Sequence, residues 1–187
     1  DIGMMKMLPN MVVINPCDYN QTKAATKAIA DYEGPVYLRF GRPKVPIFIP
    51  EDAKFEIGKA HKLSDGNDIT IVATGHLVWE AVQAAKKLKE EGISAEVINI
   101  HTIKPLDEEA ILNSVSKTGK IVVAEEHQRL GGLASTVSLL LAEKMPTPMS
   151  VVAVQDSFGE SGTPAQLMTK YGLSLDNVYA KCKDLVS

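Results

Sequence analysis

The sequence predicts an α/β protein with a mostly parallel sheet flanked by helices, preceded by a partial β-α-β piece of a second α/β domain. The main observation is the stretch Asp68–Gly92, where a β-branched apolar run ends at Gly75 and apolar residues at helix spacing follow. The next apolar run, Ile93–Ile100, is typical of a buried strand. Strand, helix and strand in this order predict a right-handed βαβ unit with parallel strands.

The first part of the chain contains the short β-α-β piece. Met11–Ile14 and Val36–Phe40 are typical of strands, and Asp18 can cap a helix that extends to about Tyr32. Two strands and one helix bury too little apolar surface to be stable alone. We therefore expect residues 1–42 to be the tail of a domain whose front is absent, with their apolar face covered by the C-terminal domain or by a second copy.

Residues 43–58 are expected to be an extended linker, because three prolines interrupt them, at Pro43, Pro46 and Pro50. A second domain is expected over residues 59–187. Its other predicted elements are a strand at Lys59–Leu63, a helix from Asp107 to Lys117, a strand at Lys120–Glu125, a helix at Leu133–Glu143, a strand at Val151–Val154, a helix at Thr163–Lys170, and a last helix capped by Ser174 or Asp176.

Composition excludes several classes of protein. The chain has 187 residues and a formal net charge of −3 that is spread evenly, so nothing indicates nucleic acid or a membrane surface as a partner. It contains no apolar run of transmembrane length and no signal peptide. Cys17 and Cys182 are far apart without metal-site spacing, which predicts a reduced, cytoplasmic protein. Because the chain begins with Asp1, we expect it to start within a larger protein.

Arg39 and Arg42 form the first candidate site. They flank the end of the Val36–Phe40 strand, with Gly41 allowing a sharp bend between them and Pro43 stiffening the chain after it. A guanidinium group at a strand end suits a phosphate or a carboxylate. The alternative is a surface arginine next to a linker.

Glu125, Glu126 and His127 follow a predicted strand, and together they could perform acid–base chemistry or bind a metal. Because neighbouring residues of a strand point to opposite faces, a structural or solvated role is favoured for them. His76 follows Gly75 at a strand end, where open α/β sheets gather ligands, but capping or packing is the more common role there.

The stretch Arg129–Ser135 contains Gly131 and Gly132 at the entry to a helix, whose free N–H groups could hold an anion. It fits neither G-x-G-x-x-G nor a P-loop, so the alternative is that the glycines allow close helix packing. The remaining polar features have no assigned role: His61, His101 and the loop Asp156–Gly162, which could be a lid or a dimer contact. The residues alone indicate an α/β piece of an enzyme, without a nucleophile elbow or a metal cluster.

Five stretches then resemble transketolases, in order along the whole chain. Asp1–Asn10 resembles the segment just after the Thr-His-Gln-Pro motif of that family, and Val36–Pro43 resembles the strand and turn that close its pyrimidine-binding domain. The C-terminal domain of the family is resembled by Thr74–Val78, Ile100–Leu106 and Val123–Gly132. The runs Gly75–Val78 and His101–Leu106 are most similar to transketolases of the shorter or animal-like branches.

The resemblance implies an enzyme of the pentose phosphate pathway that uses thiamine diphosphate with magnesium or calcium and moves a two-carbon ketol unit between sugar phosphates. In this family the cofactor lies between two subunits of a homodimer. The residues that bind and activate it would precede this chain. We therefore expect no catalytic, cofactor-binding or metal-binding residue here, and no cofactor on the chain alone.

The family resemblance assigns one residue of this chain to a site. Arg42 matches the substrate-phosphate arginine, whereas Arg39 is a neighbour without a role. The isolated chain is expected to be inactive and to contribute dimerisation, with a second copy, the missing N-terminal part and sugar phosphates as partners. The C-terminal domain of the family is often called regulatory, without an agreed ligand.

Two alternatives remain. The first is a deoxyxylulose-phosphate synthase or the β subunit of a 2-oxoacid dehydrogenase, although the Arg42 turn favours a phosphorylated sugar over a 2-oxoacid and the motifs favour transketolase over the synthase. The second is a non-enzymatic assembly or regulatory module. Since a natural split subunit would carry the whole pyrimidine-binding domain, the start at Asp1 favours cleavage or truncation.

Overall fold

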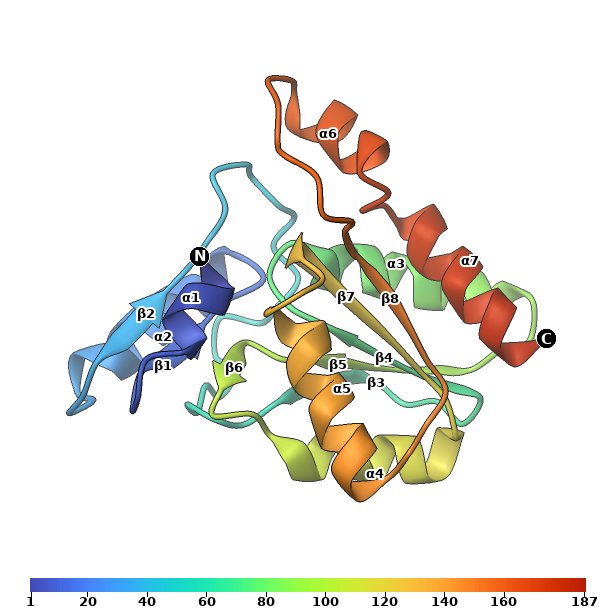
Figure 1. Ribbon diagram of the computed structural model, residues 1–187, viewed down its shortest axis with the longest axis horizontal. Helices are drawn as coiled ribbons and strands as arrows, with labels where there is room; N and C mark the ends of the chain where they lie inside the picture. The colour runs from blue at the N-terminus through green and yellow to red at the C-terminus, as the bar shows by residue number, and fades with distance from the viewer.

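The computed structural model describes residues 1–187, and Figure 1 shows their arrangement. The helices are α1 (Ile2–Lys6), α2 (Tyr19–Ala30), α3 (Leu77–Glu90), α4 (Glu108–Thr118), α5 (Leu133–Lys144), α6 (Pro164–Lys170) and α7 (Leu175–Val186). The strands are β1 (Val12–Ile14), β2 (Val36–Leu38), β3 (His61–Ser64), β4 (Ile69–Ala73), β5 (Ala95–Asn99), β6 (Thr102–Lys104), β7 (Ile121–Gln128) and β8 (Met149–Val154). No helix combines the length and the apolar composition needed to cross a membrane.

The larger sheet confirms the predicted fold class. Its strand order is β3-β5-β4-β7-β8, and every pair is parallel except β3 with β5 at one edge. All positions of β4 and β5 are buried, as expected for strands covered on both faces. Helices α3 and α7 pack on one face, and α4 and α5 on the other (Figure 1).

Two of the predicted helix caps explain where helices begin. Asp18 Oδ1 accepts a hydrogen bond from Gln21 N at 2.9 Å at the start of α2. Asp107 Oδ1 accepts one from Ala110 N at 3.2 Å at the start of α4. These bonds satisfy N–H groups that a helix cannot pair internally. The last helix, α7, begins after Ser174, the first of the two predicted caps.

The smaller sheet joins the first part of the chain to the second. Its order is β2-β1-β6, with β1 parallel to β2 and antiparallel to β6. Strand β6 is not predicted from the sequence; it is only three residues long and immediately precedes the turn at Lys104-Pro105. Ile2 and Val13 are fully buried in the same apolar cluster as Ile100. The C-terminal domain therefore covers part of the apolar surface of the first part, while other apolar side chains there, such as Met7 and Phe40, are exposed.

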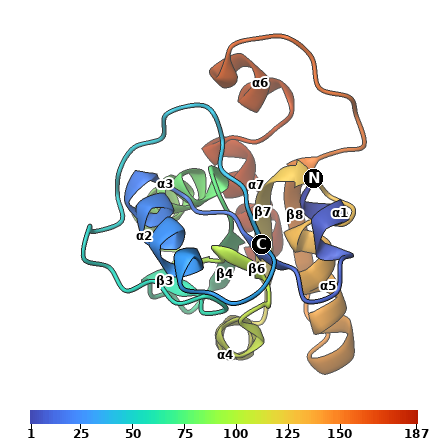
Figure 2. The same cartoon turned by 90° about the vertical axis from the view of Figure 1, so that its left-hand side faces the viewer.

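The chain between β2 and β3 forms no helix or strand. It leaves the small sheet, loops outward and returns along the side of the molecule (Figure 2). Its return is fixed where Phe48 and the buried Ile49 pack against the main core. The linker and its boundaries at residues 42 and 58 remain predictions. At the other end of the chain, α6 stands away from the sheets (Figure 1), and none of its residues is buried.

Candidate functional site

The carboxyl ends of strands from both sheets meet at one place. Arg39 N, just after β2, donates to Ile14 O at 2.8 Å, and Gly75 N, just after β4, donates to Asn15 O at 3.2 Å. Ligands of α/β proteins gather at such ends. Arg39, His76 and Glu126, which lie far apart in the sequence, are brought together here.

Arg39 is a structural contact between the two parts of the chain and not a free surface side chain. Its Nη2 atom donates to the backbone oxygen of Glu126 at 3.2 Å, and its Nε atom lies 3.2 Å from Asp1 Oδ2. The side chain is only 20% exposed. Its guanidinium is thus committed to partners within the chain, which corrects the alternative of a surface arginine beside a linker.

His76 supports the turn at Gly41. A β-carbon at residue 41 would overlap the Cε1 and Nε2 atoms of the His76 ring, so only glycine fits without movement. Gly41 is not in the left-handed backbone region, so close approach to the ring, and not a sharp bend, explains the glycine. His76 Nδ1 lies 2.8 Å from Glu126 Oε2. Although burial raises the pKa of Glu126, the bond from His76 and the charges of His76 and Arg39 hold it below its ordinary value.

Arg42 is exposed and forms no hydrogen bond or ion pair within the chain. It lies in the Arg42 segment, which we define as Phe40–Ile47. This segment separates a cavity of about 530 Å³ from another of about 510 Å³, and Pro43, Lys44, Val45 and His76 line both. Arg42 itself lines neither cavity, but an uncommitted guanidinium can bind an anion in bidentate fashion.

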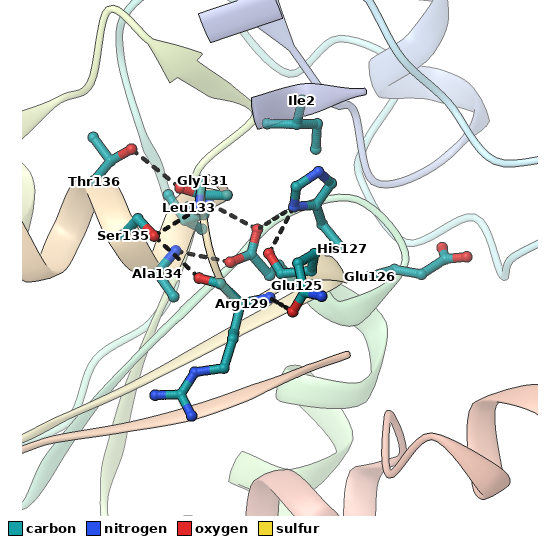
Figure 3. A network of polar contacts seen from close by, with 12 residues as sticks. Ile2, Glu125, Glu126, His127, Arg129, Gly131, Leu133, Ala134, Ser135 and Thr136 are labelled. Carbon is teal, nitrogen blue, oxygen red and sulfur yellow. Dashed lines mark hydrogen bonds and ion pairs between the residues drawn. The ribbon is translucent and has the colours of Figure 1, made fainter. Parts of the chain in front are cut away.

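Glu125 fills the N-terminus of α5 (Figure 3). Its fully buried carboxylate accepts hydrogen bonds from Leu133 N at 2.7 Å and Ala134 N at 2.8 Å. A β-carbon at Gly132 would overlap this carboxylate. Burial raises the pKa of Glu125, and the two N–H groups oppose that rise. The N-terminus of α5 therefore holds an anion, as the sequence suggested, but this anion is the side-chain carboxylate of Glu125. Residue 132 must be glycine because the carboxylate lies too close to its backbone for a β-carbon.

Glu126 and His127 alternate across the strand as predicted. Figure 3 shows Glu126 directed away from Glu125 and His127, which share one face. His127 Nδ1 lies 4.0 Å from Glu125 Oε2 and 2.8 Å from Gln128 O, to which it can donate. Burial lowers the pKa of His127. The three residues thus do not form one site, and no group of three or more His, Cys, Asp or Glu side chains is placed to hold a metal ion.

The other candidate residues have local partners. The Arg129 side chain points away from the Glu125 carboxylate (Figure 3) and donates to Gln155 Oε1 at 3.3 Å. His101 is buried against the Phe55 ring, with 4.2 Å between ring centroids. His61 is half-buried on β3. In the exposed Asp156–Gly162 loop, Asp156 Oδ1 accepts a bond from Gln128 Nε2 at 3.1 Å, and the roles of lid or dimer contact remain predictions.

Sequence reasoning missed the contact of His76 with Gly41 and the pairing of His76 with Glu126. The available signal was that His76 and Gly41 each follow a predicted strand end. Nothing in the sequence, however, indicates which strand ends of two different sheets meet. That information comes from the pairing of β1 with β6, which brings the two sheets together.

Both parts of the chain are similar to known proteins. The family described as the transketolase C-terminal domain matches residues 58–178, and the transketolase pyrimidine binding domain matches residues 1–47. A 6-deoxy-6-sulfo-D-fructose transketolase subunit from Clostridium sp. (strain MSTE9) is 43% identical over 95% of this chain and 55% of the relative. A 1-deoxy-D-xylulose-5-phosphate synthase from Desulforudis audaxviator is 37% identical over 95% of this chain and 29% of the relative.

A solved structure is also similar over nearly the whole chain. It is described as a split gene transketolase, inactive beta4 tetramer, and it is 44% identical with a TM-score of 0.96. The similarity covers 99% of this chain and 61% of that chain. The chain thus spans a little over half the length of the transketolase subunit and of the solved chain that it matches.

Proposed function

The chain belongs to the transketolase family, and on that premise we propose that it is the C-terminal part of an enzyme that transfers a two-carbon ketol unit between sugar phosphates. The observation that carries the proposal is the exposed, uncommitted Arg42 guanidinium, held near the junction of the two matched regions. Arg39 has internal partners, but Arg42 has none. A free arginine fork binds a phosphate or a carboxylate in bidentate fashion, and phosphate is the group that sugar phosphates supply.

Three helix N-termini of this chain are closed to the diphosphate of this family's cofactor. A diphosphate needs free N–H groups or cations, yet side-chain carboxylates already accept from the first turns of α2, α4 and α5. These carboxylates belong to Asp18, Asp107 and Glu125. Thiamine diphosphate supplies carbanion chemistry when bound in this family. We propose that it binds with its magnesium or calcium ion to residues outside this chain.

The partners that we propose are an N-terminal part or subunit and a second copy of this chain. Support comes from the relative described as a transketolase subunit and from the solved structure described as an inactive beta4 tetramer. A chain that self-associates but is inactive alone would fit a contribution of assembly contacts and a phosphate-binding arginine. Cleavage or truncation of a longer protein and a natural split gene both remain compatible with this proposal.

A deoxyxylulose-phosphate synthase is the second candidate, because relatives with that name cover 95% or more of this chain. Their identity is lower, at 37% and 34%, and the chain matches only 29% of their length. The transketolase subunit has 43% identity over 55% of its length. Transketolase activity is therefore the better supported of the two.

Reconstitution tests the proposal. The protein that contains this chain is assayed for ketol transfer with thiamine diphosphate and magnesium, alone and with its N-terminal partner. We expect activity only with the partner, and calorimetric titration of this chain alone should show no cofactor binding. Formation of deoxyxylulose phosphate in place of ketol transfer would favour the synthase, and activity of the chain alone would refute the division of roles.

Arg42→Ala tests the phosphate site in the reconstituted enzyme. Loss of charge-assisted bonds should raise KM for a phosphorylated ketose about ten- to a hundredfold. The KM for the same ketose without its phosphate should change less than about twofold, because that substrate makes no such bond. A sulfonated ketose belongs in the panel, since its terminal group is also a tetrahedral anion. Equal effects on charged and neutral donors would remove the phosphate role.

A further inference from the structure

The Arg42 segment is held at its two ends and free of hydrogen bonds between them. At one end, Arg39 N donates to Ile14 O at 2.8 Å. At the other end, Phe48 N and Ile49 N donate to Asp18 Oδ2 at 2.9 and 2.8 Å. Residues 40–47 form no hydrogen bond or ion pair with the rest of the chain. A segment with so few contacts has many accessible conformations unless something packs against it.

The His76 ring provides that packing, beside the residue that precedes Arg42. The ring lies against the backbone of Gly41 so closely that no β-carbon fits there. His76 is only 11% exposed and comes from the strand-to-helix turn between β4 and α3. The C-terminal domain thus supports the turn of the first part of the chain through an imidazole side chain.

Glu126 closes a ring of contacts around this turn. Its carboxylate lies 2.8 Å from His76 Nδ1, and its backbone oxygen accepts from Arg39 Nη2 at 3.2 Å. A carboxylate this close to one ring nitrogen favours one orientation of the imidazole. The chain of contacts therefore leads from Arg39 through Glu126 and His76 to Gly41, two residues further along the same turn.

We propose that His76, oriented by Glu126, is a positioning residue that sets where the Arg42 guanidinium meets the substrate's phosphate. This inference rests on the proposed role of Arg42. Without the ring, the segment keeps its two anchored ends but loses the contact beside Arg42, so Arg42 spends less time in the binding position. Misplacement of a binding group by about 1 Å is enough to weaken its effect severely.

The test uses the reconstituted enzyme with xylulose phosphate and xylulose as donors and inorganic phosphate as a competitor. His76→Ala should raise KM for xylulose phosphate and the inhibition constant of phosphate together, by about fivefold. The kcat value and the KM for xylulose should stay within about twofold. Glu126→Gln, which weakens the pairing but keeps the shape, should give a smaller change in the same direction. His61→Ala, which removes a half-buried histidine on β3 that lines neither of the two cavities beside the segment, is the matched control.

A double variant separates positioning from general destabilisation. Gly41→Ala places a methyl group into the His76 ring and should raise KM for xylulose phosphate by about tenfold. In Gly41→Ala with His76→Ala the overlap is gone, so the combined effect should be no larger than that of His76→Ala alone. Gly159→Ala, at an exposed glycine with open space around it, is the control for the added methyl group.

The outcomes test the positioning role of His76 separately from the phosphate role of Arg42. If Arg42→Ala is selective for the phosphorylated donor but His76→Ala is not, the positioning role is wrong and the phosphate role stands. If Arg42→Ala affects both donors equally, the phosphate role is wrong and the inference falls with it. Additive losses in the double variant, or a His76→Ala loss of kcat shared by both donors, would show a merely structural histidine.

Discussion

The Asp18 side chain accepts hydrogen bonds from three backbone N–H groups, and its replacement by Asn should measure how firmly the Arg42 segment is anchored. One carboxylate oxygen accepts from Gln21 N at 2.9 Å and caps α2. The other accepts from Phe48 N and Ile49 N, where the Arg42 segment ends. The side chain is 3% exposed, so water cannot replace these bonds. Asn has nearly the same shape and is itself a good N-cap, so the substitution removes the second anchor selectively.

The magnitude can be worked out from the bonds lost. A hydrogen bond to a charged group contributes about 1.5 kcal/mol or more. If the Asn side-chain oxygen stays bonded to Gln21 N, the amide nitrogen faces the N–H groups of Phe48 and Ile49 and cannot accept from them. Two hydrogen bonds are then lost, so Asp18→Asn should lower the free energy of unfolding by about 3 kcal/mol. If the amide rotates to keep Phe48 and Ile49 bonded, the cap bond is lost instead, and the loss falls to about 1.5 kcal/mol.

Urea unfolding and amide hydrogen exchange provide the assay. Exchange at Phe48 and Ile49 should accelerate in Asp18→Asn more than exchange in β4, because the anchor opens locally before the core does. Asp31→Asn is the matched control: Asp31 is exposed at the other end of the same helix and has no side-chain partner. It should change stability by less than about 0.5 kcal/mol, or raise it slightly by removing a negative charge from the helix C-terminus. Equal stability of the two variants would refute the reasoning.

Two further predictions concern buried groups. Gly132→Ala pushes a methyl group into the Glu125 carboxylate and should cost about 2 kcal/mol in urea unfolding, whereas Gly159→Ala should cost nothing; equal stability of both would refute the close approach. Burial, with the nearby His61, lowers the pKa of His101 to about 4. Because the unfolded chain takes up this proton near pH 6.5, stability should fall by up to about 3 kcal/mol as the pH drops from about 6.5 to 4. His101→Asn should remove this part of the acid sensitivity. If the variant loses as much unfolding free energy between about pH 6.5 and 4 as the original chain, the role of His101 is contradicted.

The regular elements could be predicted because their signals are local. Asp18 and Asp107 precede helices as side-chain caps, and the mostly apolar, β-branched run of β4 has the pattern of a strand buried on both faces. The strand β6 was missed because it has three residues and owes its existence to pairing with β1, which is about ninety positions earlier in the chain. Its pattern, His-Thr-Ile-Lys, does not by itself separate a strand from the start of a turn.

The candidate site shows the same division between local and long-range information. The alternation of Glu125 and Glu126 across β7 is a consequence of strand geometry and was predicted. The ligand of the α5 N-terminus was not, because it is a carboxylate eight residues before Leu133, brought there by the turn that ends β7. An open anion site and a closed cap have the same glycine signature in the sequence, and only the position of Glu125 distinguishes them.

The position of Arg42 depends on both parts of the chain, although it lies in the segment matched by the pyrimidine binding domain. Its turn comes after β2, which is held in register by β1, and β1 is paired in turn with β6 of the C-terminal domain. His76 and Glu126 of that domain then contact the turn directly or through Arg39. If Arg42 has the proposed phosphate role, the C-terminal domain would therefore set the geometry of a binding group that it does not itself contain.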